Sequence, residues 1–115
     1  MFKMFQRNDF SARFIYKENN IPKDINGWEY IFVIKNENDN SSNDSKALLK
    51  KRVLIENSVD GVFYVNLTST DTSIAVGTYE TQLLLTRINP DTGLRQNSTI
   101  FTDKVRILEN LVKEV

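Results

Sequence analysis

Alternation of apolar and polar residues with a period of two recurs along this sequence of 115 residues. The strongest example covers residues 28–35, where Trp28, Tyr30, Phe32 and Ile34 fall on one face of an expected strand. Seven such segments are separated by turn residues, at the spacing of about 8–12 residues expected of two packed sheets. The sequence therefore predicts one all-β domain that spans residues 1–115.

The seven segments differ in how clearly they alternate. Residues 9–16, 28–35, 62–68, 78–86 and 98–108 predict strands. Residues 2–6 are either an edge strand, which we prefer, or a flexible arm. Residues 46–56 look extended at 53–55 but are also compatible with a helical turn at 47–51. Residues 109–115 are either a short helix or a loose tail, and residues 18–22 are a turn.

The segment 71–85 organises the predicted fold. It contains a polar crossover, then Gly77, then Tyr79 just inside a late strand. Sandwich domains close a corner in this way, with the ring in the core and the hydroxyl bonded to upstream backbone. An ordinary half-buried tyrosine is the alternative. We predict an immunoglobulin-like, antiparallel sandwich of two sheets, with Trp28 and Tyr79 near its centre and Gly77 as a third structural residue.

Some apolar residues fall on the face of a strand that is not expected to be buried in the core. Ile31 and Val33 lie on the face of their strand opposite Trp28. Either a partner covers this second face, or the strand lies centrally beneath a loop. With Phe2, Met4 and Phe5 of the first segment, these residues are the predicted interface positions, and a homo-oligomer is one form that the interface can take.

The composition excludes several classes of chemistry. The sequence has no cysteine and no histidine, which removes disulfides, thiolate ligands and the usual general base. Fifteen basic residues balance fifteen acidic ones, so no overall field favours nucleic acid or an anionic membrane. The start lacks the apolar run of a signal peptide. We expect no enzyme activity, no cofactor, no metal, no nucleic-acid partner and no membrane partner.

Two polar segments have alternative interpretations. Residues 36–45 contain no apolar side chain and predict an exposed loop, and their oxygen-rich side chains also suggest calcium. The segment lacks the glycine and closing glutamate of an EF-hand, so a solvated loop is preferred. The cluster Lys50, Lys51 and Arg52 suggests phosphate contact, but a charged strand edge is the preferred interpretation.

Several short motifs follow one another at a particular order and spacing along the sequence. The first half carries Arg7-Asn-Asp-Phe10, then Ile21-Pro-Lys-Asp-Ile-Asn-Gly-Trp28 and Phe32-Val-Ile-Lys35. The second half carries Asp60-Gly-Val-Phe-Tyr-Val-Asn-Leu-Thr68, then Asp71-Thr72 and Gly77-Thr-Tyr79. In their order and spacing these motifs resemble the N-terminal immunoglobulin-like domain of phage baseplate upper proteins, and the resemblance covers residues 7–107. The sequence departs from it at Asn8, where the family has glycine, and in the longer 36–45 loop.

The resemblance implies a noncatalytic structural or adaptor protein of a phage tail, baseplate or neck. Such a protein is made in the host cytoplasm, resides in the virion and docks onto other phage structural proteins. We expect no fibre or receptor-binding region after residue 115, which makes a capsid decoration protein an alternative. A carbohydrate-binding module on the virion surface is another, and it requires an exposed aromatic platform.

Overall fold

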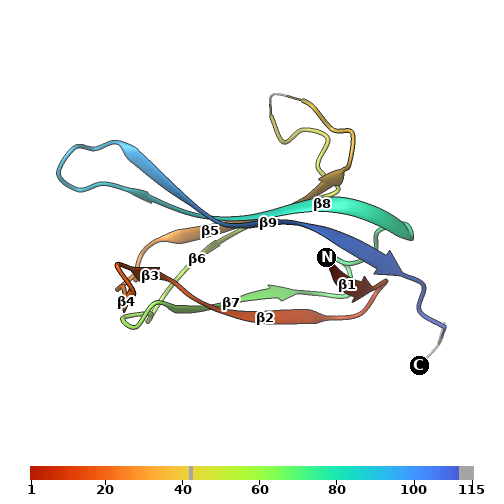
Figure 1. The fold of residues 1–115 in the computed structure, drawn as a ribbon, viewed down its shortest axis with the longest axis horizontal. Helices are drawn as coiled ribbons and strands as arrows, with labels where there is room; N and C mark the ends of the chain where they lie inside the picture. Colours follow the sequence, from red (N-terminus) through yellow and green to blue (C-terminus); the bar gives the residue numbers. More distant parts are fainter. Residues whose placement is uncertain (42, 112–115) are drawn as a thin grey trace.

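The computed structural model describes residues 1–41 and 43–111. These residues form strands and no helix, so the predicted all-β class is confirmed. No helix in the described part of the chain has the length and apolar character needed to cross a membrane. The strands are β1 (Phe2–Phe5), β2 (Phe10–Ile15), β3 (Lys17–Glu18), β4 (Ile21–Pro22), β5 (Glu29–Asn36), β6 (Leu49–Leu54), β7 (Val62–Leu67), β8 (Gly77–Ile88) and β9 (Arg95–Leu108) (Figure 1).

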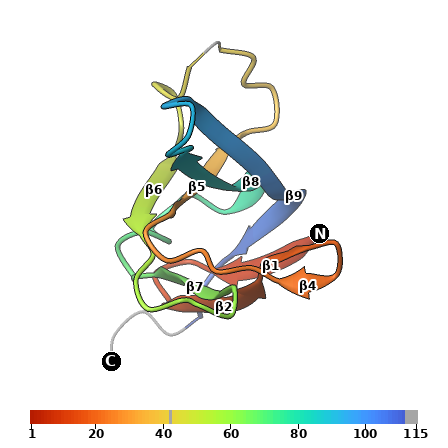
Figure 2. The same cartoon turned by 90° about the vertical axis from the view of Figure 1, so that its left-hand side faces the viewer.

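The strands are arranged in two layers. Five form one sheet in the order β1-β9-β8-β5-β6, while β2 pairs with β7 in a second sheet and β3 pairs with β4. Figure 1 shows β2 and β7 running below β5, β8 and β9, and Figure 2 shows the same layers from the end. Strand pairing is antiparallel except between β1 and β9, which run parallel.

The core fills the space between the layers. Side chains of a strand alternate between its faces, so every second residue of β5, β7 and β8 is directed inward. On β5, Phe32 is 2% exposed and lies beside Leu83 in the pairing register of β5 and β8. The other buried apolar side chains of these strands are Tyr30, Ile34, Phe63, Val65, Leu67, Tyr79 and Leu85.

The first segment is a strand of this same domain. β1 pairs with the end of β9, with Phe2 beside Val105 and Met4 beside Ile107. Met4 is 2% exposed and belongs to the core, so its prediction as an interface residue is wrong. The sequence did not indicate this burial, because β1 pairs with residues about a hundred positions later in the chain and no local pattern specifies that pairing.

Trp28 lies at the end of the inner face and not at its centre, which corrects the prediction. β5 starts at Glu29, and the Trp28 ring is only partly buried. It packs 5.6 Å from the ring of Tyr16, which lies just beyond the end of β2. Arg87 stacks over the indole at 5.0 Å. The central aromatic residue of β5 is Phe32.

Tyr79 makes the corner contact that the sequence predicted. Its ring is buried, and its hydroxyl donates a 2.6 Å hydrogen bond to the backbone carbonyl of Ala75. The bond fixes the crossover against the start of β8. Gly77 is less constrained than expected, because an added Cβ would meet the Tyr79 ring and hydroxyl only at ordinary contact distances.

We expect Tyr79→Phe to lower the free energy of unfolding by about 1 kcal/mol, because the variant leaves the Ala75 carbonyl without its donor. Urea unfolding measures the change. Tyr64→Phe is the control, since Tyr64 is 52% exposed on the outer face of β7. Equal stability of Tyr79→Phe and the wild-type protein would contradict a stabilising corner bond.

Other segments refine the predicted boundaries. β6 begins at Leu49, so the helical turn considered at 47–51 is not formed. The predicted turn at 18–22 includes the short β3–β4 pair. Residues 109–111 form neither helix nor strand, and residues 112–115 of the predicted tail lie outside the described residues.

The five-stranded sheet is curled. The pairing of β8 with β9 shifts between Leu83 and Leu84, whose partners are Phe101 and Thr99, and this leaves Ile100 as an extra residue. A bulge of this kind bends its strand and increases the local twist. Figure 1 shows the β8–β9 hairpin bending beyond the end of the β2–β7 layer.

Candidate docking surface

The outer face of the five-stranded sheet, which faces away from β2 and β7, carries a shallow apolar hollow. At its centre are Ile31 and Val33 of β5 and Leu84 of β8, all partly buried. Ile31 lies directly beside Leu84 in the register of the two strands. The hollow has a volume of about 360 Å³ and is also lined by Lys35, Asp44, Glu80, Thr81, Gln82 and Thr102. We call it the outer-face hollow.

The explanation that β5 lies centrally beneath a loop is met in part, and coverage by a partner stays a prediction. β5 is central, because it lies between β8 and β6. The segment that joins β5 to β6 rises beside the sheet on its outer side (Figure 1) and contributes Asp44 to the hollow. The centre of the hollow nevertheless stays open, so the described residues leave these apolar side chains accessible to a partner.

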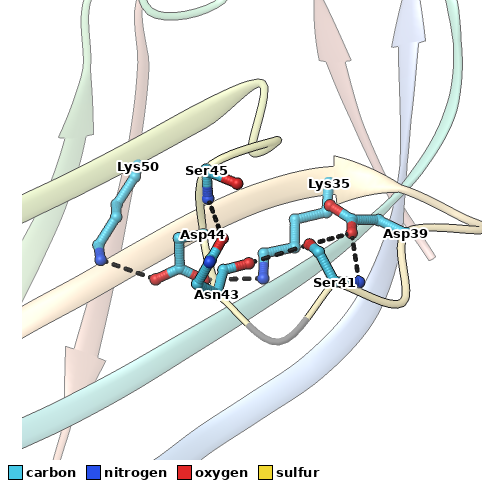
Figure 3. A network of polar contacts seen from close by, with 7 residues as sticks. All are labelled: Lys35, Asp39, Ser41, Asn43, Asp44, Ser45 and Lys50. Atoms are coloured by element: carbon cyan, nitrogen blue, oxygen red, sulfur yellow. Dashed lines mark hydrogen bonds and ion pairs between the residues drawn. The ribbon is translucent and has the colours of Figure 1, made fainter.

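Ion pairs fix the loop between β5 and β6 at one side of the hollow. Asp44 accepts from Lys35 and from Lys50, each at 2.7 Å, and thereby ties its loop to β5 and β6 (Figure 3). The hydrogen bond from Lys35, and then that from Lys50, holds the pKa of Asp44 below its ordinary value. Nearby, the Asp39 carboxylate accepts from the Ser41 backbone N–H and hydroxyl (Figure 3).

These contacts weaken the calcium interpretation of residues 36–45. The two lysine ammonium groups occupy the Asp44 oxygens that a cation would need. Among residues 1–41 and 43–111, no group of three or more acidic side chains is placed to hold a metal ion. The loop is better described as a segment that ion pairs fix beside the outer-face hollow.

The cations of β6 are also paired, as expected of a charged strand edge. Lys50 contacts Asp44, Lys51 contacts Asp71 at 2.9 Å, and Arg52 forms a two-point pair with Glu29. β6 is an edge strand of the five-stranded sheet. Because each cation already has a carboxylate, the Lys50–Arg52 cluster offers little to a phosphate.

Asp71 fixes the crossover between β7 and β8. Burial raises its pKa, but hydrogen bonds from Thr68 and Lys51 outweigh burial, so the pKa lies below the ordinary 3.8. The backbone N–H of Thr68 donates to the carboxylate at 2.9 Å. The next residue, Thr72, is fully buried and donates its hydroxyl to the Asn8 carbonyl at 2.7 Å.

We expect Asp71 to stabilise the protein at neutral pH and to lose this effect in acid. A depressed folded-state pKa gives stability that is present above the ordinary value of 3.8 and lost as pH falls through the lower folded-state pKa. Asp71→Asn should therefore cost about 1 kcal/mol at neutral pH and progressively less as the pH falls below 3.8. Thermal melting across this range measures it. A constant difference at all pH values would contradict the ionised pair.

The remaining predicted interface residues lie at a different place. Phe5, at the end of β1, is 49% exposed, whereas the Phe2 ring packs 6.0 Å from the rings of Phe10 and Phe101. These residues do not adjoin Ile31 and Val33, which line the outer-face hollow. Leu84 was not among the predicted interface residues, and its apolar position on the outward side of the strand 78–86 was the available signal.

No exposed aromatic platform forms around Trp28. Arg87 covers the indole ring, and Tyr16 lies tilted against it. A sugar ring would have to displace the Arg87 side chain before it could stack on Trp28. The structure therefore gives little support to the carbohydrate-binding interpretation at this position.

The sequence matches no protein-family model and no curated protein.

Proposed function

We propose that this protein is a noncatalytic structural adaptor of a phage virion, in the tail, baseplate or neck. It acts by docking onto other virion proteins. The observation that carries the docking role is the outer-face hollow, where the apolar side chains of Ile31, Val33 and Leu84 are bordered by polar residues that include the Lys35–Asp44 ion pair. Such an apolar centre with a polar rim is typical of protein interfaces.

The fold that we propose for this role is an immunoglobulin-like sandwich. The order β9-β8-β5-β6 fits the order G-F-C-C′ of the larger sheet in variable-type domains, with β2 and β7 as B and E. The Tyr79 corner bond at the start of β8 supports the same assignment, because strand F carries this tyrosine. The virion setting rests on the sequence motifs 7–10, 21–35, 60–68 and 71–79, which resemble baseplate upper proteins.

The direction of the carboxyl pKa shifts favours a structural role over a catalytic one. The shifted carboxyl pKa values, those of Glu29, Asp39, Asp44, Asp71 and Asp103, all lie below their ordinary values. A general acid needs a raised pKa, so these groups are not prepared for that task. They act in ion pairs and turn contacts.

The test uses the phage that encodes the protein. Purified particles, separated into heads and tails, should contain the protein in the tail fraction by mass spectrometry. Val33→Asp places a charge in the outer-face hollow and should prevent incorporation while melting stays close to that of the wild-type protein. Tyr64→Asp, on the opposite layer, is the control and should be incorporated.

Three results would overturn all or part of the proposal. Absence of the protein from purified particles would exclude the virion role, and recovery with heads alone would favour the capsid decoration alternative. Normal incorporation of a folded Val33→Asp variant would instead exclude the outer-face hollow as the docking surface and leave the virion role standing.

A further inference from the structure

A second apolar site lies in the seam between the two layers. Phe10, Ala12 and Phe14 of β2 face Phe101 of β9 across an opening of about 290 Å³. The rings form a chain of contacts: Phe14 lies 5.7 Å from Phe101, and Phe2 lies 6.0 Å from Phe10 and from Phe101. Phe32 and Val65 of the core also line the opening. We call this site the phenylalanine groove.

The groove opens because the second sheet has two strands among the residues that the structure describes. β2 pairs with β7 along Phe10–Ile15, and in the described residues no strand pairs with its other edge. Its three inward side chains, Phe10, Ala12 and Phe14, are therefore only partly covered. A free strand edge presents unpaired N–H and C=O groups, which an extended peptide can satisfy.

The outward side of this edge carries two cations. Arg13 of β2 and Lys17 of β3 are exposed, and neither makes an ion pair with any described residue. Successive side chains of a strand beside β2 would point alternately into the groove and outward next to these cations. Acidic residues at the outward positions would complement the charge.

We propose that the free edge of β2 accepts an extended segment of a partner protein as a third strand. One apolar side chain of the segment enters the phenylalanine groove above Ala12, and its acidic residues face Arg13 and Lys17. Backbone hydrogen bonds to β2 supply affinity, and the groove selects the side chain. This inference rests on the docking part of the proposed function and adds the kind of segment that docks.

The probe is a capped peptide of seven residues, with glutamate at the odd positions and valine, phenylalanine and valine at the even ones. Its sequence reads the same in both directions, so it tests parallel and antiparallel pairing together. In NMR spectra of the labelled protein, we expect the largest shifts at the amides of Phe10–Ile15. Replacing glutamate by lysine, or N-methylating alternate amides, should each weaken binding at least about tenfold.

Variants of the protein test separately the charge beside the β2 edge and the shape of the phenylalanine groove. Arg13→Glu should weaken the glutamate peptide and strengthen the lysine peptide, because it reverses the charge beside the edge. Lys46→Glu makes the same charge change in the loop after β5 and should leave binding unchanged. Ala12→Leu fills the groove and should weaken both peptides at least about tenfold if melting shows that it folds.

Several results would overturn the inference. These are no binding, binding that N-methylation leaves unchanged, and shifts confined to the outer-face hollow. A dimer that pairs β2 with β2 and excludes the peptide would also overturn it, since a second copy would then occupy the edge. Incorporation into tails without peptide binding would contradict only this inference. Absence from virions would contradict only the proposed function.

Discussion

Replacing Phe32 with alanine should lower the free energy of unfolding by about 3–5 kcal/mol, the usual cost of truncating a buried phenylalanine. The side chain is 2% exposed and lies between the two layers, beside Leu83 of β8. It also lines the inner wall of the phenylalanine groove, so its loss would join the groove to a new internal space. Urea unfolding followed by tryptophan fluorescence measures the change.

The matched control is Phe5→Ala, because Phe5 is 49% exposed at the end of β1. We expect this variant to lose less than about 1 kcal/mol. Similar losses in the two variants would mean that Phe32 is not the central core residue. A small loss at Phe32 alone would show that the neighbouring side chains close the cavity.

Gly61→Ala should be at least as damaging as many core truncations, although it adds only one methyl group. Gly61 has a φ of +78°, which side chains of L-residues rarely adopt. An added Cβ would overlap the carbonyl oxygen of Tyr16 and lie 3.1 Å from that of Lys23. The backbone there cannot move freely, because the Tyr16 N–H donates to the Gly61 carbonyl at 2.9 Å.

Gly93→Ala separates the cost of the positive φ from the cost of the steric overlap. Gly93 has a φ of +70°, but an added Cβ would have no neighbour within 4 Å. We therefore expect Gly93→Ala to cost about 1 kcal/mol for the backbone conformation, and Gly61→Ala to cost about 3 kcal/mol or more. Thermal and urea unfolding of both variants measure this. Equal costs would show that the turn at Gly61 relaxes and accommodates the methyl group.

The strands were predictable wherever one face of a strand is buried and the other is not. Phe63, Val65 and Leu67 alternate with polar residues, and the structure places all three in the core. The bond from the Tyr79 hydroxyl was predictable for a similar reason, since a polar crossover followed by an inward tyrosine is a local pattern. Local alternation therefore identified most strands and their inward faces.

The errors arose from long-range pairing. Met4 and Phe10 follow similar patterns in the sequence, but Met4 is sealed in the core by β9 while Phe10 lines an open groove. Nothing local distinguishes them, because the difference depends on which strands lie beside them. Leu84 is also apolar on the outward side of its strand, but the pairing of β5 with β8 was needed to place it beside Ile31.

The parallel pairing of β1 with β9 has a consequence for synthesis of the protein on the ribosome. Strand β1 is made before β2–β8, whereas its partner residues, Val105–Leu108 of β9, are made only after them. Until then Met4 has no place in a finished core, and the groove beside Phe101 does not exist. Loop-closure entropy opposes contacts between such distant segments, so we expect this closure to come late in folding. A nascent chain stalled before β9 should therefore stay sensitive to protease.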